Sequence, residues 1–316
     1  KEGLTVFREQ QFSASQRSAP VKRIEDVLTL RARQFAEDAG PLAHNVRPES
    51  YIEINNFYTA TVYEKGGEVI GMLRTYLGAD LYRAGVDLYF DRHDGQACTI
   101  EDWLACFEEV SAEDLSQFKR WYSQAGTPKV IASWEQTGET LTLRLAQEVP
   151  PTPDQPMKEP ARIPLRIGLL DESGAEILPD TLIDLDAAER TDTFDISAAH
   201  GRVVPSLLRG FSAPVILDQP LTLADRRTIL MHDTDPFNRW EAGRTLLKEV
   251  IITDATGTSP DRRDDTLHAL LKSAGDDTLD PAFRALLLAF PSEEDIARTL
   301  AEMNVVPDPD QIRASI

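Results

Sequence analysis

The stretch VIASWEQTGETLTLRL, residues 130–145, decides the fold class, because apolar and polar side chains alternate near both of its ends. Alternation with a period of two residues is typical of β-strands that bury one face. Similar short runs follow at Ile163–Leu170, Leu182–Leu185, Thr193–Ile196 and Val215–Leu217. Short strands with turn residues between them predict a small antiparallel β-sandwich over residues 127–218. We expect the proline-rich stretch 149–164 to be an extended loop or an edge, because proline cannot donate a ladder hydrogen bond.

On either side of this region the apolar period becomes that of a helix. Before it, residues 1–126 show helical spacing at Ile24–Arg31, Val69–Leu77, Leu81–Phe90, Thr99–Val110 and Leu115–Gln124. After it, residues 219–316 again predict helices joined by short loops, as in the stacked hairpins of an α-solenoid. The sequence therefore predicts a multidomain α+β protein with three domains, 1–126, 127–218 and 219–316.

The composition is that of a globular protein without the marks of a nucleic-acid-binding or membrane-spanning chain. Its 316 residues include 33 basic and 53 acidic ones, for a formal net charge of −20. This charge argues against nucleic acid as a partner, because phosphate binding needs a basic surface. No apolar run approaches the roughly 20 residues that cross a bilayer. The two cysteines, Cys98 and Cys106, are too few for a disulfide framework and favour a reducing compartment.

Catalytic motifs are sparse when the residues are taken by themselves. The five histidines show no H-x-x-x-H or H-E-x-x-H spacing, and the sequence has neither a G-x-S-x-G elbow nor a P-loop. Two features leave alternatives open. Glu2, at the start of an amphipathic run, is either a solvated carboxylate or one ligand of a metal site. Tyr63, in the polar and aromatic segment 55–67, is either a packing tyrosine or a functional one.

Two segments resemble parts of the gluzincin aminopeptidases. Lys1–Arg8 (KEGLTVFR) is similar to the segment that follows the H-E-x-x-H helix in that family, and Asn55–Gly66 (NNFYTATVYEKG) is similar to its catalytic-tyrosine segment. Further stretches resemble the bacterial aminopeptidase N group of the family: Phe35–Ala39, Tyr89–Gly95, Arg120–Pro128, Thr152–Gln155 and Phe211–Val215. Order and spacing agree through the first two predicted domains, and the last helical region matches more weakly.

The resemblance implies the helical lobe of a thermolysin-like catalytic domain, then the β-sandwich, then the first helices of a superhelical domain. It implies a parent zinc metalloaminopeptidase of the membrane alanyl aminopeptidase type, which removes N-terminal residues from peptides by attack of metal-activated water. Glu2 would be one zinc ligand, and Tyr63 would donate its hydroxyl to the oxyanion of the tetrahedral intermediate. Asn55 and Tyr58 would lie near the substrate cleft, and Glu64 would either support the site or be a solvated acid.

The departures from the family pattern limit what this chain can do. It contains no H-E-x-x-H helix and no G-A-M-E-N segment, so it holds one zinc ligand of three and no general base. We therefore expect an internal part of a cytoplasmic, monomeric aminopeptidase, inactive by itself, because Glu2 alone is not expected to bind zinc tightly. The alternative is a non-catalytic interaction module, built from the sandwich and helices, that has lost its metal site. An H-E-x-x-H motif shortly upstream of Lys1 would decide between them.

Overall fold

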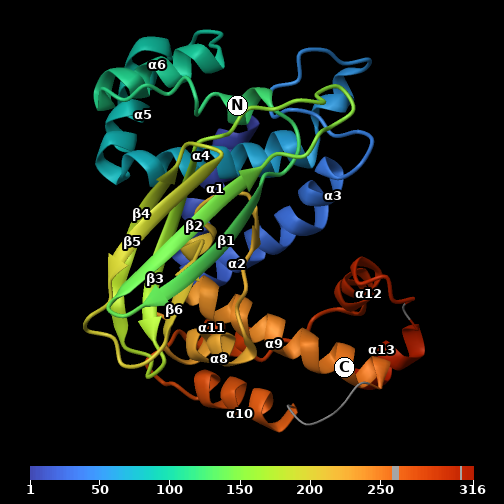
Figure 1. The fold of residues 1–316 in the computed structure, drawn as a ribbon. Helices are drawn as coiled ribbons and strands as arrows, with labels where there is room; N and C mark the ends of the chain where they lie inside the picture. The colour runs from blue at the N-terminus through green and yellow to red at the C-terminus, as the bar shows by residue number, and fades with distance from the viewer. Residues whose placement is uncertain (258–262, 307) are drawn as a thin grey trace.

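Two groups of helices lie at opposite ends of a β-sandwich in the computed structural model, which describes residues 1–257, 263–306 and 308–316 (Figure 1). The predicted multidomain α+β class is therefore confirmed. The exact boundaries at residues 126 and 218 stay predictions. No helix in the described ranges combines the length and the apolar character that crossing a bilayer requires.

The first group of helices precedes the sandwich. Its members are α1 (Glu2–Gln16), α2 (Ala19–Thr29), α3 (Phe35–Asp38), α4 (Gly66–Leu77), α5 (Ala79–His93), α6 (Ile100–Ser111) and α7 (Arg120–Ser123). Two π-helical turns, Leu30–Gln34 and Thr61–Lys65, lead into α3 and α4. Local chemistry sets several ends: Gly78, with φ of +83°, ends α4. Thr99 and Asp102 form a capping box at the start of α6, with N···O distances of 2.8 and 3.1 Å.

The sandwich consists of two sheets. One has the strand order β5-β2-β1-β7 and the other has the order β4-β3-β6. The strands are β1 (Lys129–Thr137), β2 (Thr140–Glu148), β3 (Ile163–Asp171), β4 (Glu176–Leu185), β5 (Glu189–Asp195), β6 (Val203–Leu207) and β7 (Ile216–Asp218). Leu141, Leu143 and Leu145 of β2 are buried, as their alternation predicts. The pairs are antiparallel except that the short β7 runs parallel to β1.

Strand β6, which has Pro205 at its centre, is absent from the sequence prediction. Proline lacks the backbone donor that an inner strand needs. In the structure β6 pairs only with β3 and forms the edge of its sheet, with Pro205 opposite Leu169. The proline is therefore tolerated.

The predicted helix over 115–124 is wrong for most of its length. Only Arg120–Ser123 is α-helical, and turns precede it. The side chains of this segment bond instead across to the loop before β3. Arg120 Nη1 donates to the Pro160 carbonyl at 2.5 Å, and Trp121 Nε1 donates to the Arg162 carbonyl at 2.7 Å. Both residues lie in the short helix itself, and the backbone before it forms turns, in which the Lys119 N–H donates to the Leu115 carbonyl at 2.9 Å.

The second group of helices follows the sandwich. It contains α8 (Leu223–His232), α9 (Pro236–Thr256), α10 (Arg263–Ala274), α11 (Pro281–Leu287), α12 (Glu293–Glu302) and α13 (Pro309–Ser315). Side chains at the N-caps accept backbone N–H groups at several starts, among them Thr222 before α8 and Asp235 before α9. The long α9 contacts α8, α10, α11, α12 and α13, so it is the centre of this group.

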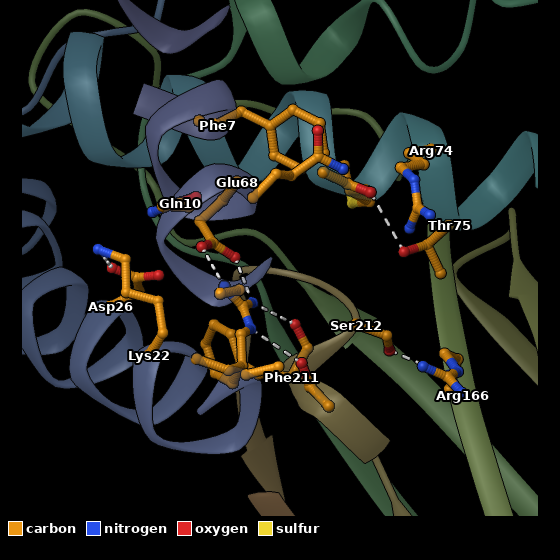
Figure 2. A pocket seen from close by; sticks show the side chains of 18 of the residues that line it. Phe7, Gln10, Lys22, Asp26, Glu68, Arg74, Thr75, Arg166, Phe211 and Ser212 are labelled. Atoms are coloured by element: carbon orange, nitrogen blue, oxygen red, sulfur yellow. Dashed lines mark hydrogen bonds and ion pairs between the residues drawn. The ribbon is translucent and has the colours of Figure 1, made fainter. Parts of the chain in front are cut away.

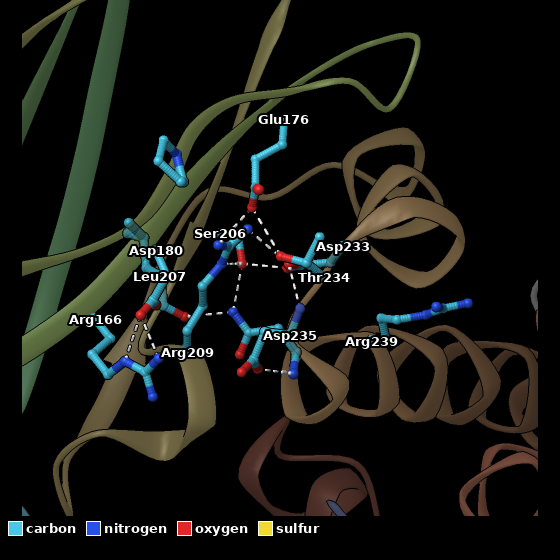
Figure 3. Close-up of polar contacts among 12 residues, drawn as sticks. Arg166, Glu176, Asp180, Ser206, Leu207, Arg209, Asp233, Thr234, Asp235 and Arg239 are labelled. Carbon is cyan, nitrogen blue, oxygen red and sulfur yellow. Dashed lines mark hydrogen bonds and ion pairs between the residues drawn. The ribbon is translucent and has the colours of Figure 1, made fainter. Parts of the chain in front are cut away.

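The loop from β6 to β7 joins the sandwich to both helical groups. Arg23 of α2 pairs with Glu68 of α4 through two 2.6 Å contacts, and donates to the carbonyls of Gly210 (3.0 Å) and Phe211 (2.8 Å) (Figure 2). The buried Arg209 guanidinium forms ion pairs with Glu176 of β4 and Asp233 beyond α8 (Figure 3). A single short loop therefore fixes all three parts of the chain against one another.

Candidate functional site

Glu2 and Tyr63 are brought together by a close crossing of α1 over the turn that begins α4. A Cβ atom on Gly3 would lie 2.4 Å from the carbonyl carbon of Gly66, so the two backbones touch. Only glycine permits this approach. The crossing places the first turn of α1, with Glu2, beside the π-helical turn Thr61–Lys65 that carries Tyr63.

Tyr63 is half-buried in the middle of its turn. Its ring centroid lies 6.2 Å from that of Tyr58. Desolvation raises the pKa of the Tyr63 hydroxyl above its ordinary value, and the negative charge of Glu2 raises it further, followed by Tyr58 and Glu64. A tyrosine hydroxyl is protonated at neutral pH even without this shift, so the Tyr63 hydroxyl can donate a hydrogen bond.

Glu2 is partly exposed, with 33% of its side chain accessible. A carboxylate oxygen is a suitable zinc ligand. The part of the chain that the structure describes contains no group of three or more His, Cys, Asp or Glu side chains that could hold a metal ion. The residues present therefore supply one donor and do not themselves form a zinc site.

The other two predicted site residues lie on the segment that enters the π-helical turn. Asn55 is part of an exposed 3-10 turn, Ile54–Phe57, and its carbonyl accepts the Tyr58 backbone N–H at 3.2 Å. Tyr58 is 64% exposed and reaches the site only through its ring contact with Tyr63. Glu64 follows Tyr63 in the turn and pairs with Arg33 at 3.4 Å.

Two residues that the sequence prediction did not single out, Glu37 and Asp38, hold the π-helical turn. Glu37 accepts hydrogen bonds from Thr61, and Asp38 forms a buried ion pair with Lys65. Burial opposes ionisation of Asp38, but Lys65 and hydrogen bonds lower the pKa of its carboxyl below the ordinary value. The sequence contains one signal for them, because both residues lie in Phe35–Ala39, a segment that carries the family resemblance. Their contacts to the turn Thr61–Lys65 depend on how α3 packs against it, which the sequence does not predict.

Matches to known families follow the three parts of the structure. Residues 1–122 match the peptidase family M1 domain. Residues 126–220 match a domain of unknown function with an Ig-like fold, DUF3458. Residues 223–316 match DUF3458_C, described as ARM repeats. The predicted order of a helical M1 part, a β-sandwich and a solenoid-like region is thereby confirmed.

Similar proteins of known name are bacterial aminopeptidases. Aminopeptidase N of Caulobacter vibrioides is 52% identical over 94% of this chain, and that of Escherichia coli is 41% identical over 94%. Aminopeptidase N of Haemophilus influenzae is 39% identical over the whole chain. The crystal structure of Legionella pneumophila aminopeptidase A in complex with aspartic acid superposes with a TM-score of 0.80, at 26% identity over 99% of this chain.

The chain spans about a third of each of these proteins: 34%, 35% and 37% of the three aminopeptidases N, and 34% of the Legionella structure. Within that span the match runs through all three parts. Residues 1–122 therefore match the peptidase family M1 domain, and the chain is similar to bacterial aminopeptidase N through this part and through the Ig-like and ARM-repeat parts.

Proposed function

We propose that this chain forms part of a zinc-dependent aminopeptidase that removes N-terminal residues from peptides. The observation that carries the proposal is the crossing at Gly3 and Gly66, which brings the Glu2 carboxylate within electrostatic reach of the Tyr63 hydroxyl. A non-catalytic module would need neither group at this crossing. The names of the relatives support a peptidase, and the resemblance of the segments that carry Glu2 and Tyr63 to gluzincin aminopeptidases supports the zinc-dependent, alanyl aminopeptidase type.

Tyr63 is the chain's contribution to the transition state. A protonated hydroxyl at this place donates a hydrogen bond to the oxyanion that forms when the scissile carbonyl is attacked. Such a donor is typically worth about 2.7–4 kcal/mol. Asn55 and Tyr58, on the exposed segment next to Tyr63, would line the substrate side of the site. Glu2 would be one carboxylate ligand of a zinc ion whose other ligands lie outside residues 1–316, in a cytoplasmic, monomeric enzyme.

Replacing the Tyr63 hydroxyl tests this proposal. In the complete enzyme, Tyr63→Phe should lower kcat for an aminoacyl anilide by about 10²–10³-fold, because an oxyanion donor is lost, while the zinc content stays the same. Tyr82→Phe is the matched control: its hydroxyl is buried without a hydrogen-bond partner among the described residues, so its loss should leave kcat unchanged. Full activity of the Tyr63→Phe enzyme would rule out the assigned role.

The metal requirement is tested on two samples. A chelator should abolish turnover by the complete enzyme, and added zinc should restore it. The 316-residue chain alone should show no turnover, because it holds a single ligand. Zinc-dependent hydrolysis by the purified chain would contradict the assignment of the remaining ligands to other residues.

A further inference from the structure

The π-helical turn that carries Tyr63 needs support from outside itself. π-helical turns are rare and often occur at functional sites. The segment before this one, Tyr51–Tyr58, is largely exposed, with Ile52 96% and Tyr58 64% accessible. The chain entering the turn contacts Tyr63 through the Thr59 carbonyl, which accepts its N–H at 3.1 Å, and through the exposed Tyr58 ring, so buried support has to come from another element.

Glu37 supplies that support at the first residue of the turn. Its Oε2 atom accepts hydrogen bonds from both the backbone N–H and the side-chain hydroxyl of Thr61, each at 2.8 Å. The buried Gln34 donates to the same hydroxyl at 3.3 Å. Hydrogen bonds to an ionised carboxylate are stronger than those between neutral groups. Thr61 is thus held through its backbone as well as its side chain.

The last residue of the turn is held by the next residue of α3. Lys65 Nζ pairs with Asp38 Oδ2 at 2.8 Å, with both side chains 1% exposed, and also donates to the Gly126 carbonyl at 2.9 Å. Thr127 donates to the same Asp38 oxygen at 2.9 Å. Asp38 therefore fixes the exit of the turn to the start of the sandwich.

We propose that Glu37 is a positioning residue for Tyr63, acting through Thr61. Tyr63 lies midway between Thr61 and Lys65. Glu37 and Asp38 of α3 hold these two residues in place, so the orientation of the Tyr63 hydroxyl depends on both carboxylates. No hydrogen bond joins Glu37 to Tyr63 itself in the described structure, which makes the action indirect. The inference rests on the proposed function, because it assumes that the Tyr63 hydroxyl stabilises the oxyanion.

The test is a double-mutant cycle in the complete enzyme. Glu37→Ala should lower kcat by about 10- to 100-fold, the loss expected when a catalytic group is displaced by about 1 Å, with zinc content unchanged. Glu37→Gln should retain part of the activity, because its amide oxygen can still accept from Thr61. In the Tyr63→Phe enzyme, Glu37→Ala should change kcat by less than about 2-fold. Glu25→Ala, an exposed glutamate of α2, is the control.

A second measurement does not depend on activity. Hydrogen exchange of the Thr61 amide should be faster in Glu37→Ala, because its acceptor is gone, while the amides in the middle of α4 keep their rates. Equal losses of kcat from Glu37→Ala with and without the Tyr63 hydroxyl would overturn the inference, as would unchanged kcat in both Glu37 variants. If instead Tyr63→Phe is fully active, it is the proposed role of Tyr63 that fails.

Discussion

At the scale of single residues, Asp26 shows how burial changes the chemistry of a charged side chain. It lies on the wall of a cavity of about 210 Å³ between α1, α2, α4 and the loop before β7 (Figure 2). Burial raises the pKa of its carboxyl to about 6, although the ion pair with Lys22, at 2.9 Å, and the nearby Arg23 oppose the shift. The folded chain therefore binds a proton here at a pH where the unfolded chain does not.

This shift predicts a pH-dependent contribution to stability. Because the folded pKa of Asp26 is above its unfolded value of 3.8, its stabilising contribution is lost as the pH rises through about 6. Asn does not ionise, so Asp26→Asn does not lose stability in this way. The melting temperature of the variant minus that of the unmodified chain should therefore be larger at pH 7.5 than at pH 5. Thermal unfolding of both proteins at the two pH values checks it. An offset that does not change with pH would contradict the assigned pKa.

At the scale of elements, the site depends on how closely two helices cross. Gly66 and Gly67 of α4 face Gly3 and Val6 of α1, where a Cβ on Gly67 would lie 3.0 Å from Val6. The absence of side chains lets the helices approach at the level of their backbones. The crossing holds Glu2 against the turn of Tyr63, although the two residues are far apart in the sequence.

Gly3→Ala should disturb this crossing. The new methyl group would meet backbone atoms of Gly66 rather than a movable side chain, so α1 has to shift. Overpacking of this kind typically costs about 1–3 kcal/mol of unfolding free energy. Gly40→Ala is the matched control, because its Cβ would have ordinary contacts of 3.4 Å and its φ is not positive. Calorimetry of the two variants compares them, and equal stability would show that the crossing tolerates a side chain.

At the scale of the whole molecule, the loop between β6 and β7 connects the three parts of the chain. Leu208, Gly210 and Phe211 have positive φ angles of 58°, 61° and 52°, which for the two non-glycine residues is a strained conformation. The strain is sustained by partners on every side: Arg23 bonds to the backbone of the loop, and Asp235 accepts the Gly210 N–H at 3.0 Å (Figure 3). The ring of Phe211 packs between Phe35 and Phe237.

Removing Arg23 should lower the stability of the fold, because its guanidinium joins α2, α4 and the loop. Arg23→Met leaves the buried Glu68 without its partner, which should cost up to about 3–5 kcal/mol. Arg23→Met combined with Glu68→Met should recover much of that loss, because no unpaired charge remains. Arg83→Met, which breaks the exposed pair with Asp87, should leave the free energy of unfolding nearly unchanged. Denaturant unfolding measures the free energy of unfolding of the three variants and so ranks their stabilities. If the double variant is less stable than Arg23→Met, the buried charge is not the cause.

Local patterns in the sequence were sufficient for most elements. The two-residue period of 140–145 predicts β2, and Thr99 with Asp102 predicts the start of α6. Such patterns do not predict structure where contacts with residues distant in sequence determine the conformation. Pro205 is acceptable only because β6 is an edge strand, and the bonds of Arg120 and Trp121 to the loop before β3 join residues that no local spacing relates.

The sequence by itself determined the order of helical and strand regions, and through the family resemblance it predicts Glu2 and Tyr63 as site residues. It did so because hydrophobic period and short motifs are local properties of a chain. Only the tertiary structure decided how the site is held: the contact of Gly3 with Gly66, and the bonds of Glu37 and Asp38 to the turn of Tyr63. These contacts join residues that are far apart in the sequence and come together only on folding, so no local sequence pattern predicts them.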